Sequence, residues 1–472
     1  MIVINNKPTN QPTRTTMMMM KRTFTIIIPL LLTIIWSLQS IDTLEIWSVY
    51  FDETQELITT TTTTDDNNNT TNCLIRQIVS IPFDDNDQQI RYINEIRTYI
   101  ENGDKILRME LILCDEIIDN DIDDDRMINE ELIFMDKNET KYVCIQRLST
   151  AKWPNLEHNQ TLIQYPANVG LAFNHYRSMD SGKQTLLLMI EYLNDFYDQI
   201  IDHSGFDIYL LDETEITIEA GIIAIGIVPD SFFFIPPKLN HWSMKGVCNT
   251  NVCIQNQIDN EIRIVSVIAG TNHHYIDEMI VEIIDHQKRR RRQQIFSLNN
   301  NGGEQRTFEM LIESPIIKTT AMDKIIVECN YINTSNRTVK AGFDDENENC
   351  LVWLHHYPRI DGLDACLSTH SLATIMSLLD LNDLNVTLTR SNGIDLRIPD
   401  NNHGSKQMNL NEFLNEKDQN HNWNVDKLIR AKYNAMKGRQ ISSCGWNPMK
   451  IDLNRRRRRR DDDGGEQKKK LS

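Results

Sequence analysis

Short apolar runs with partial alternation of apolar and polar residues dominate the chain beyond residue 72. Six of these runs cover residues 106–113, 184–192, 216–228, 262–268, 279–284 and 324–331. A period of two is typical of β-strands, because successive side chains of a strand point to opposite faces of the sheet. Only residues 367–381 and 426–437 have the periodicity of helices. Many short strands favour an all-β fold of two antiparallel β-sandwich domains.

The N-terminal segment has the layout of a secretory signal peptide. A basic pair at 21–22 precedes an apolar run over 24–36, and serines at 37 and 40 suit cleavage. A membrane-spanning helix needs about 20 apolar residues, so this run is too short to be a stable span. We therefore expect a protein of the secretory pathway, secreted or held in a vesicle lumen. A retained signal anchor is the alternative.

Low-complexity segments flank the region that carries the strand pattern. Residues 59–71 read TTTTTTDDNNNTT, and residues 455–463 read RRRRRRDDD. Such compositions bury too little apolar surface to form a core. We predict a leader and signal peptide over 1–41, a linker over 42–72, sandwich domains over 73–215 and 216–453, and a charged tail over 454–472.

The charge balance excludes one class of function. Lys and Arg total 49 against 67 Asp and Glu, which gives a net charge of −18 over 472 residues. An acidic chain is a poor general binder of nucleic acid. The basic run KRRRR at 288–292 is interpreted as a solvated loop insertion, with a cleavage site as the alternative.

Cysteines and glycosylation motifs fit the secretory pathway. There are nine cysteines, so at least one has no partner within the chain if the others form disulfides. The spacing of Cys248 and Cys253 also suits zinc, although disulfides are favoured in this compartment. Candidate glycosylation sites within the predicted domains are Asn138, Asn159, Asn333, Asn336 and Asn385, each in an Asn-x-Ser/Thr motif.

Five motifs follow one another in an order that points to one family. They are YPANVGLAF at 165–173, GIIAIGIVPDSFFFIPP at 221–237, CNYINT at 329–334, AGF at 341–343 and HHYP at 355–358. Together they resemble the copper type II, ascorbate-dependent monooxygenases, and most of all the dopamine β-hydroxylase and tyramine β-hydroxylase branch. The resemblance covers residues 73 to about 450. It implies two jelly-roll-like β-sandwich domains stapled by disulfides, and hydroxylation of a phenylethylamine-type substrate with copper, ascorbate and oxygen.

The resemblance also implies a disulfide pattern. The implied pairs are Cys114–Cys144, Cys248–Cys366, Cys253–Cys444 and Cys329–Cys350. Cys73 is left without a partner in the chain, which accounts for the odd count. In the same family comparison His355 and His356 fall outside the copper ligands, and we interpret them as structural.

The copper ligands of the family are replaced. The family binds two coppers through five histidines and one methionine, and both ligand types suit copper. Their positions fall at Leu107, Arg108, Glu191, Gly270, Asn272 and Asn349 in this chain. Leucine has no donor atom, and a guanidinium does not deprotonate to become a ligand. His273 and His274 follow directly after Gly270 and Asn272, where the family has two of its histidine ligands. We interpret them as part of an exposed turn, with a surrogate metal site as the alternative.

These replacements favour a copper-free pseudoenzyme with no catalytic residues and no metal ligands. We expect it to bind a small amine or a protein partner such as an active paralogue, with Cys73 available for an intermolecular disulfide. The alternative is an active copper- and ascorbate-dependent monooxygenase with relocated ligands. Arg108 and Glu191 stand at positions that converge on one copper in the family. We therefore predict an ion pair between them.

Overall fold

The fold is described by a computed structural model whose chain divides into Met1–Glu45 and Ile46–Ser472. All elements except the first residue of β1 lie in the second unit. The structure describes residues 45–50, 61–64, 71–79, 90–101, 103–117, 133–135, 141–152, 156–173, 184–192, 202–229, 233–253, 261–270, 275–285, 291–299, 308–310, 316–318, 323–343, 347–360, 363–371, 374, 385–389, 393–400, 404–419, 433, 436, 438 and 440–444.

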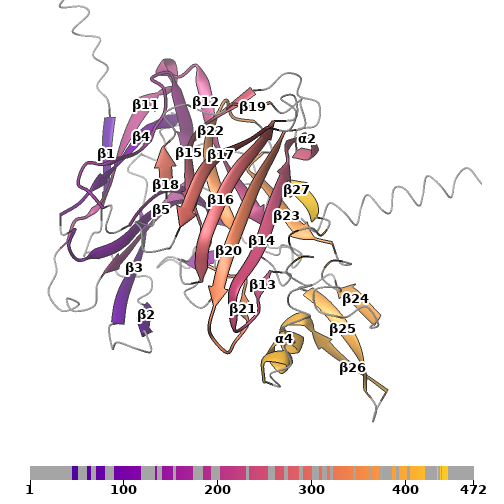
Figure 1. The fold of residues 1–472 in the computed structure, drawn as a ribbon. Coiled ribbons are helices and arrows are strands. Elements are labelled where there is room, and N and C mark those ends of the chain that lie inside the picture. Colours follow the sequence, from indigo (N-terminus) through magenta and orange to yellow (C-terminus); the bar gives the residue numbers. More distant parts are fainter. Residues whose placement is uncertain are drawn as a thin grey trace, which may run out of the picture. The chain divides into compact units, whose positions relative to one another are not determined.

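A twelve-stranded sheet runs through the middle of the fold (Figure 1). Its main path follows β1 (Glu45–Tyr50), β11 (Gly205–Asp212), β4 (Arg91–Tyr99), β9 (Val169–Phe173), β12 (Ile218–Ile227), β22 (Leu351–Tyr357), β15 (Glu261–Ala269) and β18 (Phe308–Met310). The strands β8 (Thr161–Gln164), β19 (Ile316–Lys318), β23 (Ala365–His370) and β27 (Gln440–Cys444) pair beside this path.

Two further sheets pack on it. A six-stranded sheet contains β2 (Thr61–Thr64), β3 (Thr71–Val79), β10 (Gln184–Tyr192), β5 (Ile106–Ile117), β7 (Lys141–Lys152) and β6 (Ile133–Met135). A four-stranded sheet contains β14 (Leu239–Asn249), β20 (Lys324–Asn333), β16 (Ile276–Asp285) and β17 (Arg291–Asn299). Two smaller sheets are the pair β13 (Phe234–Ile235) and β21 (Val339–Lys340), and the three strands β24 (Asn385–Thr389), β25 (Gly393–Asp400) and β26 (Gly404–Asn409). The helical elements are η3 (Glu213–Glu215), α2 (Thr250–Cys253) and α4 (Leu410–Gln419).

Strand β12 belongs to both hydrophobic cores. Its Ile223, Ile225 and Ile227 are buried in the core formed with the four-stranded sheet. Its Ile222 and Ala224 are buried in the other core, which contains the six-stranded sheet. An apolar run on both faces is what a strand buried on both sides requires. The two sandwiches therefore share a layer of strands.

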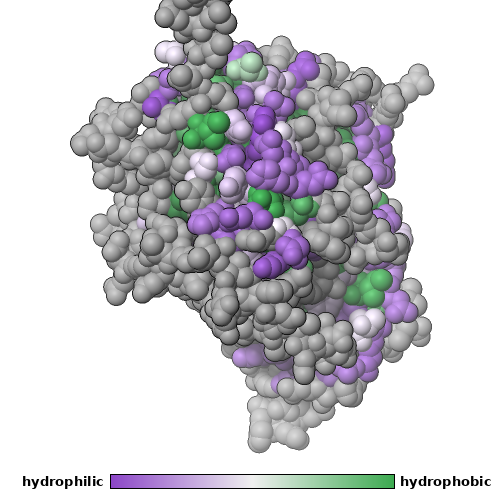
Figure 2. Space-filling view, turned by 90° about the vertical axis from the view of Figure 1, so that its left-hand side faces the viewer, coloured by the Kyte–Doolittle hydropathy of each residue, from purple (hydrophilic) through white to green (hydrophobic). Residues whose placement is uncertain are grey.

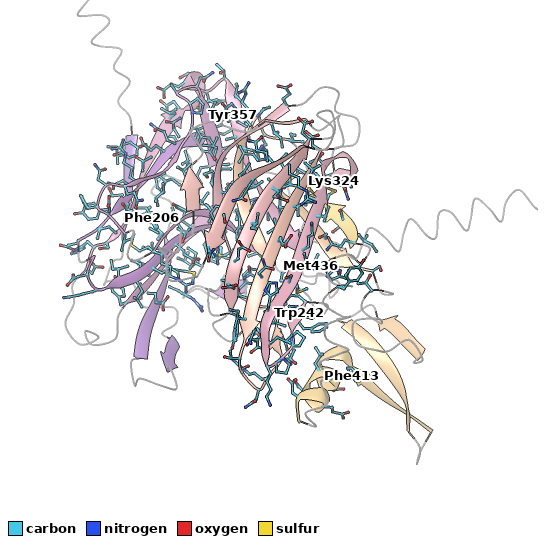
Figure 3. All side chains as sticks on the ribbon, in the orientation of Figure 1. Phe206, Trp242, Lys324, Tyr357, Phe413 and Met436 are labelled. Carbon is cyan, nitrogen blue, oxygen red and sulfur yellow. A yellow bond between two sulfur atoms is a disulfide. The ribbon has the colours of Figure 1, made fainter. Side chains whose placement is uncertain are left out.

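Large aromatic side chains fill both cores. Phe206 of β11 is fully buried in the core of the six-stranded sheet, and Trp242 of β14 is fully buried in the core of the four-stranded sheet (Figure 3). Full burial of an aromatic side chain of this size contributes about 1.5–3 kcal/mol or more to folding.

The expected all-β class is confirmed, and the six expected strands are present as β5, β10, β12, β15, β16 and β20. The predicted helix over 367–381 is wrong at its start, because residues 367–370 belong to β23, which pairs with β12 and β27. Thr374, Tyr433 and Met436 are helical, and the rest of 372–381 and of 426–437 lies outside the described residues. Helix α4 was not predicted.

Two other expectations differ from the structure. The predicted linker contains β1 and β2, because β1 pairs with β11 and β2 pairs with β3 in spite of the low complexity of residues 61–64. The sheets are also not purely antiparallel, since β12 runs parallel to β9 and to β23. The pairing of β9 with β12 joins the two predicted domains across the boundary at 215 and 216.

The described surface residues are mainly polar. Figure 2 shows hydrophilic residues with separate hydrophobic spots on the face turned to the viewer. The large hydrophobic residues that are exposed, Ile46, Tyr99, Ile332, Tyr433 and Ile441, belong to different segments. Among the described residues, no helix has the length and apolar character to span a membrane.

Candidate functional site

Three charged residues form a row across β10, β5 and β7. Glu191 pairs in register with Arg108, and Arg108 pairs in register with Lys152. Residues in register on adjacent strands project from the same face of a sheet. Arg108 Nε lies 3.2 Å from Glu191 Oε2, and their side chains are 12% and 20% exposed. The predicted ion pair is confirmed.

A second carboxylate extends this row toward the interior. Glu110 is buried, and its Oε1 lies 3.6 Å from Arg108 Nη1. Its Oε2 lies 3.3 Å from Arg147 Nη2. Burial lowers the pKa of Arg147 while the charge of Glu110 raises it. An arginine remains charged under such opposing influences. Glu110 is therefore held between two guanidinium groups.

Arg147 connects the six-stranded sheet to the shared sheet. Its guanidinium lies 4.9 Å from the centre of the Trp353 ring, within the range of a cation–π interaction. Its Nη1 donates a long hydrogen bond of 3.5 Å to the carbonyl of Ala269. A register shift of β7 between Arg147 and Ser149 accompanies this arrangement. The residue thus links β7 with β15 and β22.

Lys152 has a lowered pKa. Burial most of all, and then the charge of Arg108, lower this pKa to about 8, while Glu191, Glu110 and Glu348 act in the opposite direction. Its side chain is half-buried. An amine with such a pKa has a substantial neutral fraction near physiological pH.

Trp353 occupies the space beside Gly270. A Cβ atom at Gly270 would lie 2.1 Å from Cζ3 of Trp353 and 3.2 Å from the carbonyl oxygen of Leu351. The Gly270 amide also donates to that carbonyl at 2.9 Å. Any side chain at this position would displace the indole.

Asn349 is buried among hydrogen-bonding groups. Its Nδ2 donates to the carbonyl of Gly342 at 3.3 Å, and its backbone amide donates to Glu348 Oε1 at 3.0 Å. The hydroxyl of Tyr331 donates to the backbone carbonyl of Asn349 at 2.8 Å. The position serves the packing of the chain before β22.

Two histidines of β22 are buried and neutral. His355 Nε2 lies 3.3 Å from the carbonyl of Arg147, so this nitrogen carries the proton. His355 Nδ1 then accepts from the hydroxyl of Tyr165 at 2.7 Å. Burial lowers the pKa of His355 to about 3 and that of His356 to about 4. The motifs that begin at Tyr165 and His355 are thus in direct contact.

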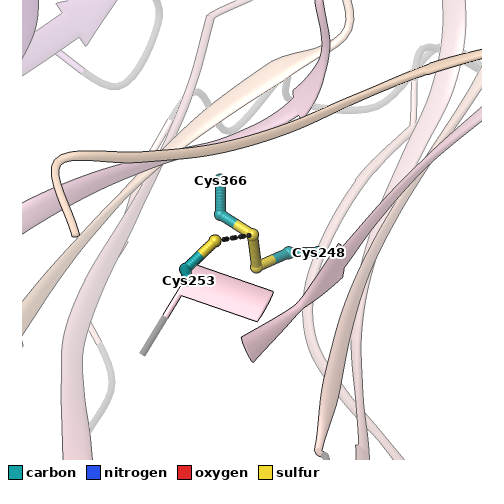
Figure 4. Close-up of side chains that lie close together, drawn as sticks. All are labelled: Cys248, Cys253 and Cys366. Atoms are coloured by element: carbon teal, nitrogen blue, oxygen red, sulfur yellow. Dashed lines mark hydrogen bonds between the residues drawn. A yellow bond between two sulfur atoms is a disulfide. The ribbon is translucent and has the colours of Figure 1, made fainter. Parts of the chain in front are cut away.

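The four disulfides are the pairs that the resemblance implied, Cys114–Cys144, Cys248–Cys366, Cys253–Cys444 and Cys329–Cys350. Two of them are adjacent, because Cys366 and Cys444 face each other in register on β23 and β27. The sulfur of Cys253 lies 3.3 Å from that of Cys366 (Figure 4). Within the described ranges, Cys248, Cys253 and Cys366 are the one group with metal-ligand spacing. All three are disulfide-bonded and have no thiolate to offer zinc.

One glycosylation candidate is wrong. Asn333 is fully buried, and its Nδ2 donates to the carbonyls of Ile235, Pro236 and Arg337. Glycosylation would use this same nitrogen and would place a sugar in the interior. Asn159 and Asn336 are exposed, and the side chains of Asn138 and Asn385 lie outside the described residues.

The family model for the C-terminal domain of copper type II ascorbate-dependent monooxygenases matches residues 218–378. This match and the relatives below support the assignment of the chain to this family. The chain is 25% identical to DBH-like monooxygenase protein 1 of Gallus gallus over 223 residues, 47% of this chain and 35% of that protein. The human protein of the same name is 26% identical over 230 residues, with the same shares covered. Tyramine beta-hydroxylase of Caenorhabditis briggsae is 23% identical over 216 residues, 45% of this chain and 35% of that protein. The matches thus span about a third of the length of these relatives.

At the copper positions of the family that the structure describes, the residues do not fit a copper ion. Leu107 is aliphatic, and Arg108 and Glu191 are paired with each other. Trp353 fills the space beside Gly270, and Asn349 is engaged with the backbone. Asn272, His273 and His274 lie outside the described residues. Cationic guanidinium groups at the centre of the site oppose binding of a second cation.

Some residues of the site were not found from the sequence. Arg147 and Trp353 are separated by 206 positions, and Lys152 has no unusual neighbours in the sequence. Only the pairing of β5 with β7 and the packing of β7 on β22 bring these residues to Arg108. The one signal in the sequence that could have pointed to Lys152 is its place, as a basic residue, at the end of an apolar strand.

Proposed function

We propose that this chain is a copper-free pseudoenzyme of the monooxygenase family. The Arg108–Glu191 ion pair carries the proposal, because it occupies two of the positions where the family binds one copper. The contact between Gly270 and Trp353 supports it at a position of the other copper. Without copper there is no site for oxygen activation or for electrons from ascorbate.

We further propose that the protein works in the secretory pathway as a binding or regulatory protein. Its four disulfides are typical of secreted and vesicular proteins. A small amine is the proposed small-molecule ligand. An active relative of the same family is the proposed protein partner.

Cys73 offers a covalent route to such a partner. It has no assigned partner among the eight cysteines of the four disulfides. If it forms an intermolecular disulfide, the wild-type protein will run at a higher mass on a non-reducing gel than Cys73→Ser. Equal masses would remove this part of the proposal.

Enzymatic assay of the copper-loaded protein tests the proposal. The protein is incubated with copper, ascorbate, oxygen and tyramine, beside an active tyramine β-hydroxylase as the positive control. We expect no hydroxylated product above the protein-free background. Product formation that a copper chelator abolishes would overturn the proposal and favour an enzyme with relocated ligands.

A further inference from the structure

The basic run at 288–292 is a motif that the proposed function does not use. Its last two residues, Arg291 and Arg292, begin β17, and Gln293 follows them. β17 is an edge strand, because among the described strands it pairs with β16 only. Exposed chain near a connection between two elements is a preferred site of proteolytic nicking. The end of the run therefore lies where an endoprotease can reach it.

Both faces of the first part of β17 are open to solvent. Arg292, Gln293 and Gln294 are all exposed, and the Arg292 side chain is 60% exposed. Successive side chains of a strand point to opposite faces, so three exposed residues in a row leave neither face covered. Burial begins at Ile295 and Phe296, which belong to the core of the four-stranded sheet. This end of β17 therefore extends past the core.

A β-bulge separates this end from the buried part of the strand. Gln294 pairs with Glu282 and Phe296 pairs with Val281, so Ile295 is the extra residue. A bulge interrupts the ladder of hydrogen bonds. Opening of residues 291–294 thus breaks a short stretch of pairing with β16 and leaves Ile295 and Phe296 in the core. Local opening needs less free energy than global unfolding, and a protease cuts the open form.

We propose that the protein is cleaved between Arg292 and Gln293 by an endoprotease of the secretory pathway that recognises runs of basic residues. The inference rests on the proposed location in that pathway. Four further basic residues at 288–291 precede Arg292 and offer cations to the carboxylates of such an enzyme. In this acidic chain of net charge −18, the other run of five or more basic residues is at 455–460.

The reaction is a hydrolysis with water as its co-reactant. The oxygen of water forms a bond to the carbonyl carbon of Arg292, and the bond from that carbon to the nitrogen of Gln293 breaks. The nitrogen takes a proton from the water and leaves as the amine of a new N-terminus. An N-terminal glutamine can then cyclise with loss of ammonia.

Disulfides keep the two products joined. Cys248–Cys366 and Cys253–Cys444 each link a cysteine before the cut to one after it. The other two disulfides each lie within one product. Pairing of β16 with β17 beyond the bulge also holds the products together. The cleaved form is therefore a two-chain protein with the same fold.

Digestion of the purified protein tests the inference. The full-length oxidised protein is incubated with a purified serine endoprotease specific for runs of basic residues, and the products are analysed by gel electrophoresis and mass spectrometry. We expect one band without reductant and two fragments with it, the second beginning at Gln293 or its cyclised form. Outside the run at 455–460, every other site should be cut at least about ten-fold more slowly. A protein that gives no fragment beginning at Gln293 overturns the inference.

A variant of the run assigns the cut. It carries Arg289→Gln, Arg290→Gln, Arg291→Gln and Arg292→Gln, which leaves one isolated lysine. This variant should remain a single chain after reduction, and circular dichroism establishes that it is folded. Two fragments from the folded variant, divided at the same place, would overturn the role of the basic run.

The basic run in the tail supplies the matched control. The control variant carries Arg457→Gln, Arg458→Gln, Arg459→Gln and Arg460→Gln. These positions lie beyond the last cysteine, so a cut there yields no disulfide-linked fragment. The control should still give the fragment that begins at Gln293, at the wild-type rate. Loss of that fragment in the control would refute the assignment to 288–292.

Expression in cultured animal cells separates this inference from the proposed function. Two-chain protein in the medium would support both. Uncut protein in the medium would overturn the cleavage and leave the proposed secretory location in place. Protein that stays in the cytosol would overturn both.

Discussion

Removal of either charge of the Arg108–Glu191 pair should destabilise the protein by about 1–2 kcal/mol. Removal of one member of an isolated buried ion pair typically destabilises a protein by about 3–5 kcal/mol, because the other charge stays buried without compensation. Here each residue keeps a second partner of opposite charge. Arg108 retains Glu110 at 3.6 Å, and Glu191 retains the nearby charge of Lys152. Glu191 is also 20% exposed, so water screens part of its charge.

A double-mutant cycle isolates the pair itself. The variants are Arg108→Leu, Glu191→Leu and the double variant, each unfolded in urea with the disulfides intact and followed by tryptophan fluorescence. The coupling energy is the difference between the double variant and the sum of the single variants. We expect about 1 kcal/mol in favour of the pair, so that the double variant loses about 1 kcal/mol less than the sum of the two single variants.

The pair Arg292–Glu282 is the matched surface control. Its Nη1 to Oε2 distance is 3.3 Å, similar to that of the buried pair, but the arginine side chain is 60% exposed. An exposed pair of this kind should give a coupling of about 0.5 kcal/mol or less. A coupling for Arg108–Glu191 that is no larger than the control would refute the argument that this pair stabilises the former copper position.

Three further variants probe the surroundings of the site. Gly270→Ala should destabilise the protein by about 1–3 kcal/mol in urea unfolding, because the added methyl group collides with Trp353. Tyr165→Phe should cost about 1–3 kcal/mol, because it leaves the buried Nδ1 of His355 without a donor. Lys152→Met should remove a rise in stability between pH 8 and 10.5. In that window the unfolded chain still binds the lysine proton while the folded chain, with its pKa near 8, has released it.

An exposed tyrosine serves as the control for the buried one. Tyr99→Phe, at a side chain 37% exposed, should change the free energy of unfolding by less than about 0.5 kcal/mol. A Gly270→Ala variant as stable as the wild type would show that Trp353 moves aside easily, and the argument against a histidine at 270 would fail. Equal losses in Tyr165→Phe and Tyr99→Phe would remove the role given to the hydrogen bond with His355.

The strands were predictable from the sequence because their burial is local and periodic. Residues 184–192 contain five consecutive apolar residues at 186–190 and form β10 over those same nine positions. The helix predicted over 367–381 is wrong at its start because pairing with β12 and β27 holds residues 367–370 in a strand. Such pairing depends on residues at least 70 positions away, and a local sequence pattern does not contain that information.

The ion pair at the former copper position was predictable for a different reason. The family resemblance placed positions 108 and 191 at one metal, so opposite charges there had to meet. No such rule existed for Arg147, Trp353 or Lys152. Their meeting depends on a register shift in β7 and on the layer of strands that both sandwiches share. The chemistry of the row is therefore a property of the fold rather than of any motif.

The copper content of the secreted and fully oxidised protein tests the central claim most directly. The protein is loaded with excess copper, dialysed against a weak chelator, and its metal is measured per mole of chain. The ion pair at Arg108 and the indole beside Gly270 predict a value near zero. A value near two would contradict the account, and would mean that His273 or His274 and other histidines have rebuilt the metal centre.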